Sequence, residues 1–328
     1  MYLHISQKSS TFATLKVRVL QKIKNISATM HKRCLHIPII VILIMSVGIH
    51  IHASSYALLV GISHYSADSN TGWEDINGVN DIRLLKTVLQ QQGFVIDTLT
   101  ETDATALNIR NAMRKLMAGV KTNDTVYLHF SGHGQPVEDT DNDEQDGWDE
   151  SFVPFDAGMW YKQGIYEGKN HITDDEFNSY FGGIRHKIGE RGLLLVIIDA
   201  CHSGTMSRMG TDSPLDVDAP VRGTYIGFSR EKIYHPVREG KVAHHFAIQA
   251  DKKLSPVVII EACQAWQQNT EVLIDRTYYG PLSYTMHTVL KNTSVGRIAY
   301  NPNIVEEAIQ HILPSWSRQQ IVIETSIR

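Results

Sequence analysis

Cysteine is scarce in this chain, which has three such residues among 328: Cys34, Cys201 and Cys263. A framework of several disulfides is therefore excluded. If an N-terminal segment that contains Cys34 is removed on export, a single bond between Cys201 and Cys263 is the most that the remainder can form.

An excess of basic charge is also lacking. The chain has 31 Lys and Arg against 35 Asp and Glu, a formal net charge of -4, and the basic residues are scattered along it. A nucleic-acid-binding surface is therefore not expected. Internal repeats and low-complexity tracts are absent too, whereas the 42% of hydrophobic residues is enough for the core of one large domain or two small ones.

The N-terminal part has the pattern of an export signal. Residues 31–33 are basic, residues 37–49 form an apolar run, and small residues follow at 53–55. We expect residues 30–54 to be a signal peptide and the product to be periplasmic or secreted. The run is shorter than the roughly 20 residues of a membrane span, and an uncleaved membrane anchor is the alternative. Residues 1–29 precede a second methionine, Met30, and carry no motif, so we expect the true start at Met30.

From residue 55 to residue 328 the sequence alternates apolar strands with amphipathic helices, which predicts one α/β domain. The expected strands are 56–62, 94–99, 124–130, 192–199, 256–262 and 319–326, and the expected helices are 80–93, 104–117, 280–293 and 303–313. Gly93 is placed to end the first helix, and Asp103 to cap the second. We predict a mostly parallel sheet of about six strands with helices on both faces.

Two long interruptions break this alternation. Residues 135–168 are rich in acidic residues and glycine, and residues 205–256 have no clear periodicity. Loops of this length inside a compact domain are usually functional or cleavable.

Two predicted strands end in reactive side chains. His133 follows one strand in "HFSGHGQ", and Cys201 follows another in "DACHSG". The carboxyl ends of neighbouring parallel strands meet at one edge of a sheet, so the two side chains are expected to face each other there. Taken singly, such residues are more often a loop histidine and a small buried thiol without a catalytic role.

A thiol with an imidazole beside it is typical of the active site of a cysteine peptidase. The imidazole favours the thiolate and later protonates the leaving amine. The backbone N–H groups of Gly134 and Cys201 are natural donors to an oxyanion. His202 would point away from the cleft if Cys201 points into it, so His202 is not expected to be the base.

Several blocks resemble the caspase-like cysteine peptidases, and the metacaspase group in particular. They occur in the family's order between Tyr56 and Leu290: "YALLVGISHY", "NGVNDIRLLKTVL", "HFSGHGQ", "DGWDESFVPFD", "ITDDEF", "VIIDACHSG", "VVIIEACQAWQQNTE" and "YYGPLSYTMHTVL". The resemblance implies a caspase-like fold and assigns His133 and Cys201 to the catalytic dyad.

The same resemblance assigns Asp81 and Asp199 to the pocket that binds the side chain before the cleaved bond. Two carboxylates there select arginine or lysine, because a buried pair of acids without a cation is costly. For Asp81 the alternative is an acidic residue that stabilises the N-terminus of a helix.

The acidic stretch "EDTDNDEQDGWDE" fails as an EF-hand, because Glu144 stands where that loop needs glycine. The resemblance implies instead that Asp149, Asp174 and Asp175 bind calcium. Arg208 occupies the position of a fourth acid and departs from the family pattern. The alternative is a solvated acidic loop.

The second interruption carries arginines that an enzyme of basic specificity could cut in its own chain, as metacaspases often do. These are Arg208, Arg222, Arg230 and Arg238. A plain surface insertion is the alternative. Cys263, which follows the predicted strand 256–262, is interpreted as a buried structural thiol or as part of the cleft wall.

The sequence thus predicts an exported cysteine endopeptidase that cleaves protein substrates after Arg or Lys and needs no cofactor for the chemistry. Calcium is a candidate activator. Two alternatives stay open. One is a caspase-fold binding module without activity, which would be expected to have a damaged dyad. The other is a related cysteine peptidase with a different preference before the cleaved bond.

Overall fold

The computed structural model describes residue 21 and residues 53–65, 71–142, 144, 146–201, 219–235, 246, 248–264, 267–313 and 320–327. Residues 53–328 form one compact unit, to which the following description applies. Most of the expected signal peptide, residues 30–52, and the arginines Arg208 and Arg238 lie outside the described residues.

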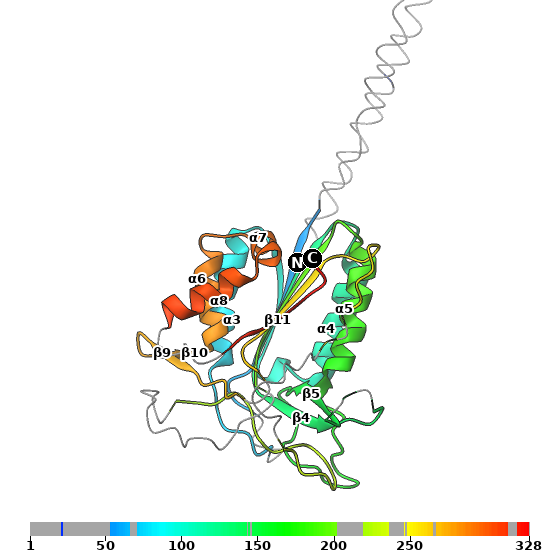
Figure 1. The fold of residues 1–328 in the computed structure, drawn as a ribbon, viewed down its shortest axis with the longest axis vertical. Coiled ribbons are helices and arrows are strands. Elements are labelled where there is room, and N and C mark those ends of the chain that lie inside the picture. The colour runs from blue at the N-terminus through cyan, green and yellow to red at the C-terminus, as the bar shows by residue number, and fades with distance from the viewer. Residues whose placement is uncertain are drawn as a thin grey trace, which may run out of the picture. The chain divides into compact units, whose positions relative to one another are not determined.

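A six-stranded sheet in the order β11-β8-β7-β3-β1-β2 runs through this unit (Figure 1). Its strands are β1 (Ser55–Gly61), β2 (Val95–Thr100), β3 (Thr125–Ser131), β7 (Leu193–Asp199), β8 (Val257–Glu261) and β11 (Val322–Thr325). All neighbours pair in parallel except β11, which is antiparallel to β8. The prediction of a mostly parallel six-stranded α/β sheet is confirmed.

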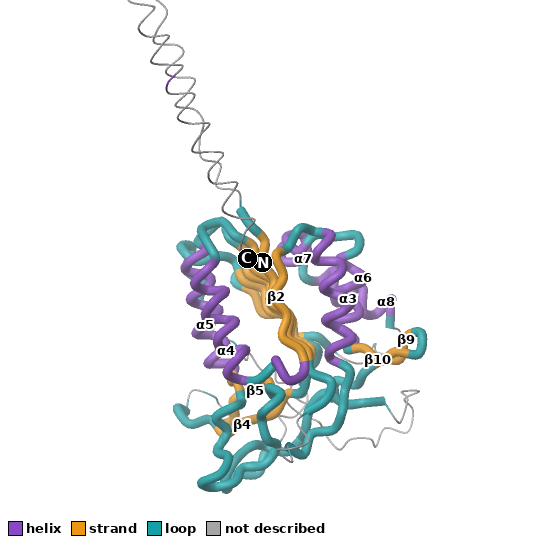
Figure 2. Tube along the Cα trace, turned by 180° about the vertical axis from the view of Figure 1, so that it is seen from behind, coloured by secondary structure: helices purple, strands orange, loops and turns teal. Residues whose placement is uncertain are grey.

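Helices cover both faces of the sheet, as the two opposite views show (Figures 1 and 2). One layer contains α4 (Ala106–Gly119) and α5 (Asp174–Ile188). The other contains α3 (Gly78–Gln91), α6 (Pro281–Leu290), α7 (Val295–Tyr300) and α8 (Asn303–Ile312).

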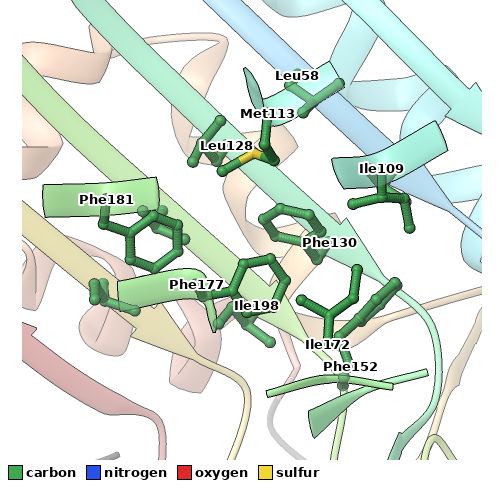
Figure 3. Close-up of a cluster of buried hydrophobic side chains, with 14 of the residues drawn as sticks. Leu58, Ile109, Met113, Leu128, Phe130, Phe152, Ile172, Phe177, Phe181 and Ile198 are labelled. Carbon is green, nitrogen blue, oxygen red and sulfur yellow. The ribbon is translucent and has the colours of Figure 1, made fainter. Parts of the chain in front are cut away.

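Alternate residues of each strand supply the two hydrophobic cores. Leu58, Leu128 and Ile198 point to the side of α4 and α5, where they join Met113 and Phe177 (Figure 3). The intervening residues of the same strands face the other helical layer. Every residue of β7 is buried, which explains why this strand is an unbroken aliphatic run rather than an alternating one.

Three local predictions were wrong. Thr105, not Asp103, caps α4: its hydroxyl accepts from the Asn108 N–H at 3.3 Å, while Asp103 ends a short 3-10 helix, Glu101–Asp103. The C-terminal part has a third helix, α7, between the two expected ones. Residues 135–168 are not all loop, because they include most of a small antiparallel sheet.

That sheet consists of β4 (Gly134–Glu138), β5 (Trp148–Phe152) and β6 (Ile172–Thr173). A hairpin of β9 (Val272–Ile274) and β10 (Thr277–Tyr279) also went unpredicted. Both additions lie beyond the same end of the main sheet (Figure 2). These strands are only two to five residues long, which is too short to show the apolar alternation by which strands are identified in a sequence.

Among the described residues, no helix is long and apolar enough to cross a membrane.

Candidate active site

The candidate site lies at the carboxyl ends of β3 and β7. These strands pair with Ser131 opposite Asp199, so His133 and Cys201 each follow a paired residue by two positions at the same edge of the sheet. Both side chains are buried, with 2% and 0% of their surface exposed. The parallel topology therefore places both residues at the same edge of the sheet.

The imidazole of His133 is oriented by a backbone carbonyl. Its Nε2 lies 2.9 Å from the carbonyl oxygen of Glu74, which can only accept, so Nε2 carries the proton and Nδ1 has the lone pair. The ring stacks on Trp73 at 4.8 Å, and the backbone N–H of His133 donates to the Tyr65 hydroxyl at 2.7 Å. The Glu74 carbonyl thus takes the orienting role for which the sequence offered no third residue.

Burial lowers the pKa of His133 to about 4, against the opposing effect of the Glu74 carbonyl; the nearby charge of Arg222 lowers it further. Nδ1 is buried and has no hydrogen-bond partner among the described residues. At neutral pH the ring is therefore an uncharged base with its lone pair available.

The Cys201 thiol lies against the loop that follows β8. Its Sγ donates to the carbonyl oxygen of Gln267 at 2.9 Å, and since His133 Nδ1 has no partner, thiol and imidazole do not hydrogen-bond to each other in this structure. Catalytic hydrogen bonds are often formed only once substrate is bound. Gly134 begins β4 opposite Phe152, and its role as an oxyanion donor stays a prediction.

Asp81 and Asp199, the two predicted pocket acids, converge on one buried arginine. The guanidinium of Arg222, fully buried, lies 2.8 Å from Asp81 Oδ2 and 3.5 Å from Asp199 Oδ1. Glu271 is a third acid in the pocket: its Oε1 accepts from both Nε and Nη2 of Arg222, at 3.0 and 2.8 Å. We call Asp81, Asp199 and Glu271 the acid pocket.

Electrostatics in the acid pocket favour a bound cation. Burial raises the pKa of Asp81 to about 7, although Arg222 acts in the opposite direction. Burial alone would also disfavour a charged Arg222, but the three carboxylates outweigh it and raise its pKa. A guanidinium is therefore held in its charged form, and three acids share one positive charge.

Neighbouring groups fix the orientation of both aspartates. Asp199 Oδ1 accepts from Asn269 Nδ2 at 2.7 Å, and its Oδ2 accepts from the backbone N–H and hydroxyl of Ser283 at 2.7 and 2.6 Å. Because the Ser283 hydroxyl donates to Asp199, it accepts from His129 Nε2 at 2.9 Å. Asp81 accepts from the Ser131 hydroxyl at 2.6 Å, so the carboxylates are held in place before any ligand arrives.

Gly280 forms part of the pocket wall. Its N–H donates to Asp81 Oδ1 at 3.0 Å, and an added Cβ would collide with Asp199 Oδ2 and Arg222 Nη1. Only glycine therefore leaves room for a guanidinium at this point.

The backbone around Arg222 lies in the site as a short added strand. Val221 forms an antiparallel bridge with Thr270, the Arg222 N–H donates to the Asn269 carbonyl at 2.9 Å, and the Glu271 N–H donates to the Pro220 carbonyl at 2.9 Å. Gly223 then packs on the backbone of Cys201, where an added Cβ would strike the Cys201 carbonyl oxygen. We call residues 219–223 the inserted segment.

The acids of the predicted calcium site lie at the small sheet. Asp149 is in β5, and Asp174 and Asp175 begin α5; Asp149 and Asp174 are buried. Burial, followed by the charges of Asp141 and Asp139, raises the pKa of Asp175. However, no three His, Cys, Asp or Glu side chains of the described residues are placed to hold one metal ion.

Sequence reasoning missed Glu271, Ser131 and Ser283. Glu271 ends the block "VVIIEACQAWQQNTE", but a lone acid in a loop gave no sign that it would turn toward Asp81. Arg222 was singled out only as one of four loop arginines. Its place in the acid pocket could not be foreseen, because 20 residues separate it from Cys201 along the chain.

The chain is similar in sequence to known metacaspases. Residues 56–209 match the family model "Metacaspase, peptidase C14 domain". The chain is similar to Metacaspase-1 of Eremothecium gossypii, with 34% identity over 165 residues, which are 45% of this chain and 32% of that protein. It is also similar to Metacaspase-3 of Arabidopsis thaliana, with 37% identity over 138 residues, 39% of this chain and 35% of that protein.

The crystal structure of protein GSU0716 from Geobacter sulfurreducens has a similar fold, with a TM-score of 0.56 at 22% identity; the match covers 84% of this chain and 94% of that one. This chain spans about a third of the length of the curated relatives that it matches. His133, Cys201, Asp81 and Asp199 fall within the family match, whereas Arg222 and Glu271 follow it.

The orientation of His133 predicts its protonation. At neutral pH we expect the uncharged Nε2–H form, and because burial lowers its pKa to about 4, the ring should gain its second proton only as the pH falls below about 5. ¹⁵N NMR of histidine-labelled protein, with the signal assigned by its absence in His133→Gln, measures both properties. Titration near the ordinary histidine pKa of about 6.5 would contradict the geometry.

Proposed function

Because residues 56–209 match the metacaspase family model, we propose that this chain is a cysteine endopeptidase that cleaves after arginine or lysine through Cys201 and His133. The observation that carries the proposal is the acid pocket with an arginine bound in it, beside a buried thiol and an uncharged imidazole.

The acid pocket accounts for a basic preference. A planar guanidinium makes charge-assisted hydrogen bonds to several carboxylates at once, and Arg222 contacts Asp81 and Glu271 at 2.8 Å each. A neutral or acidic side chain would leave the buried carboxylates without a cation, at a cost of several kcal/mol. An ammonium supplies the charge but not the fork of donors, so arginine should be preferred to lysine.

The chemistry follows from the orientation of the two reacting groups. His133 Nδ1 takes the thiol proton once Cys201 turns from the Gln267 carbonyl, and the thiolate attacks the carbonyl carbon that follows the bound basic side chain. The N–H groups of Gly134 and Cys201 bind the resulting oxyanion. His133 then protonates the leaving amine, and water hydrolyses the thioester.

The inserted segment resembles a substrate in the site. Arg222 fills the pocket, residues 220–222 pair with 269–271, and the Arg222–Gly223 peptide passes Cys201. We propose that the segment blocks the site until the bond between Arg222 and Gly223 is cut.

Calcium activation and export stay predictions. The proximity of the Asp139, Asp141 and Asp175 carboxylates supports calcium binding. Support for export comes from the pattern of residues 30–54.

Peptide hydrolysis tests the specificity. Fluorogenic Ala-Pro-Val-Arg copies residues 219–222, and we expect it to be cut faster than the matching Lys peptide, with the Asp and Asn peptides nearly inert and no hydrolysis by Cys201→Ala. Glu271→Gln should lower kcat/KM for the Arg peptide by about 10- to 100-fold, the range for a lost hydrogen bond to a charged group. Glu307→Gln, an exposed acid on α8, is the matched control.

Equal rates on the Arg and Asp peptides would contradict the role of the acid pocket. Folded protein with no activity after removal of the inserted segment would favour the binding module instead.

Self-cleavage is tested by mass spectrometry of the purified chain. We expect a new fragment that begins at Gly223, absent in Cys201→Ala and in Arg222→Ala. Arg230→Ala should leave the pattern unchanged, because the Arg230 side chain is 57% exposed and outside the pocket. A chain that stays intact while fully active, or that is cut only after Arg230, would refute the blocking role of the segment.

A further inference from the structure

Two thiols lie together at the ends of neighbouring strands. β7 and β8 pair in parallel up to Ile198 and Glu261, and Cys201 and Cys263 follow within a few residues. Cys201 Sγ donates to the carbonyl oxygen of Gln267 at 2.9 Å, and Cys263 Sγ lies 3.6 Å from the same oxygen. Cys263 is also hydrogen-bonded to Cys201, and the two cysteines are not linked as a disulfide.

The surroundings keep Cys263 protonated. Its hydrogen bond to Cys201, its burial, and the charges of Glu261 and Asp199 raise its pKa well above the ordinary value for a thiol. Cys263 is 5% exposed, and no step of the proposed peptide hydrolysis uses it. A second thiol within reach of the nucleophile therefore has no role in that reaction.

The spacing of the backbone suits a covalent link. Neighbouring strands lie about 4.8 Å apart, and disulfides usually join Cα atoms about 5.5–6 Å apart. Cys201 and Cys263 both lie beyond the last paired residues of β7 and β8, so a link between them breaks none of the hydrogen bonds between these strands.

We propose that Cys201 and Cys263 are a reversible oxidation site, at which a peroxide converts the two thiols into a disulfide. The Cys201 thiolate attacks one peroxide oxygen, the O–O bond breaks, and the products are a sulfenic acid on Cys201 and hydroxide. The Cys263 sulfur then attacks the Cys201 sulfur, so that an S–S bond forms, the S–O bond breaks and water leaves. In total, two thiols and hydrogen peroxide give one disulfide and two waters.

The disulfide has two consequences. It blocks the nucleophile, and this consequence rests on the proposed peptidase function. It also protects Cys201 from further oxidation to the sulfinic acid, which ordinary thiols do not reverse, so that reduction by a dithiol restores the original pair.

The experiment uses the full chain in a Cys34→Ser background, so that only the two thiols can react. After treatment with hydrogen peroxide we expect an intact mass lower by two hydrogen atoms, a Cys201–Cys263 linked peptide on non-reducing mapping, and a monomer on a non-reducing gel. Peptidase activity should fall with the appearance of the link and return with dithiothreitol.

Cys263→Ser, with Cys263→Ala as a second variant in case one fails to fold, should instead gain oxygen on Cys201 and lose activity that dithiothreitol does not restore. Treated protein in which Cys263 remains a thiol while Cys201 becomes a sulfinic acid would overturn the proposal. The mapping needs no peptidase activity, so a disulfide in an inactive protein would count against the proposed function alone. Activity without a disulfide would count against this oxidation site alone.

Discussion

The site depends on one buried charge, the guanidinium of Arg222 among three carboxylates. A cluster of Asp81, Asp199 and Glu271 without a cation would be costly to bury, and Arg222 supplies that cation from a segment inserted into the cleft. The cation belongs to a loop rather than to the sheet. The same requirement therefore holds the loop in the site and, under the proposed function, would allow a substrate arginine to take its place.

The main sheet places the acid pocket next to His133 and Cys201. β3 and β7 end level with each other, so the strand that supplies Asp199 also supplies Cys201, and its neighbour supplies Ser131 and His133. The first turn of α3 adds Asp81, and the stretch before β9 adds Glu271. Ser131 and Asp199, which contact the guanidinium, therefore lie two residues before His133 and Cys201, the two proposed catalytic residues. The second thiol, Cys263, follows β8, which pairs in parallel with β7 and ends at the same edge of the sheet.

The sequence was sufficient for the sheet because aliphatic runs such as 193–199 have one stable place, the middle of a parallel sheet. The sequence was also sufficient to place the residues that directly follow those runs, such as His133 and Cys201, because strand order decides at which edge of the sheet they lie. It was not sufficient for Glu271 or the Glu74 carbonyl. These are brought to the site by loops, whose course depends on long-range pairing and leaves no periodic pattern. The cap at Thr105 was missed for a local reason, because Asp103 is already part of a 3-10 helix.

The most direct test of the account is whether the acid pocket binds a guanidinium in place of Arg222. In a Cys201→Ala background, Arg222→Ala leaves the carboxylates uncompensated, and removing one partner of a buried ion pair usually costs about 3–5 kcal/mol. We therefore expect a lower Tm that agmatine raises in a saturable manner, with butylamine less effective and the parent with Arg222 unaffected. A Tm that agmatine does not change in the variant, or changes equally in both proteins, would contradict the claim that this pocket selects basic side chains.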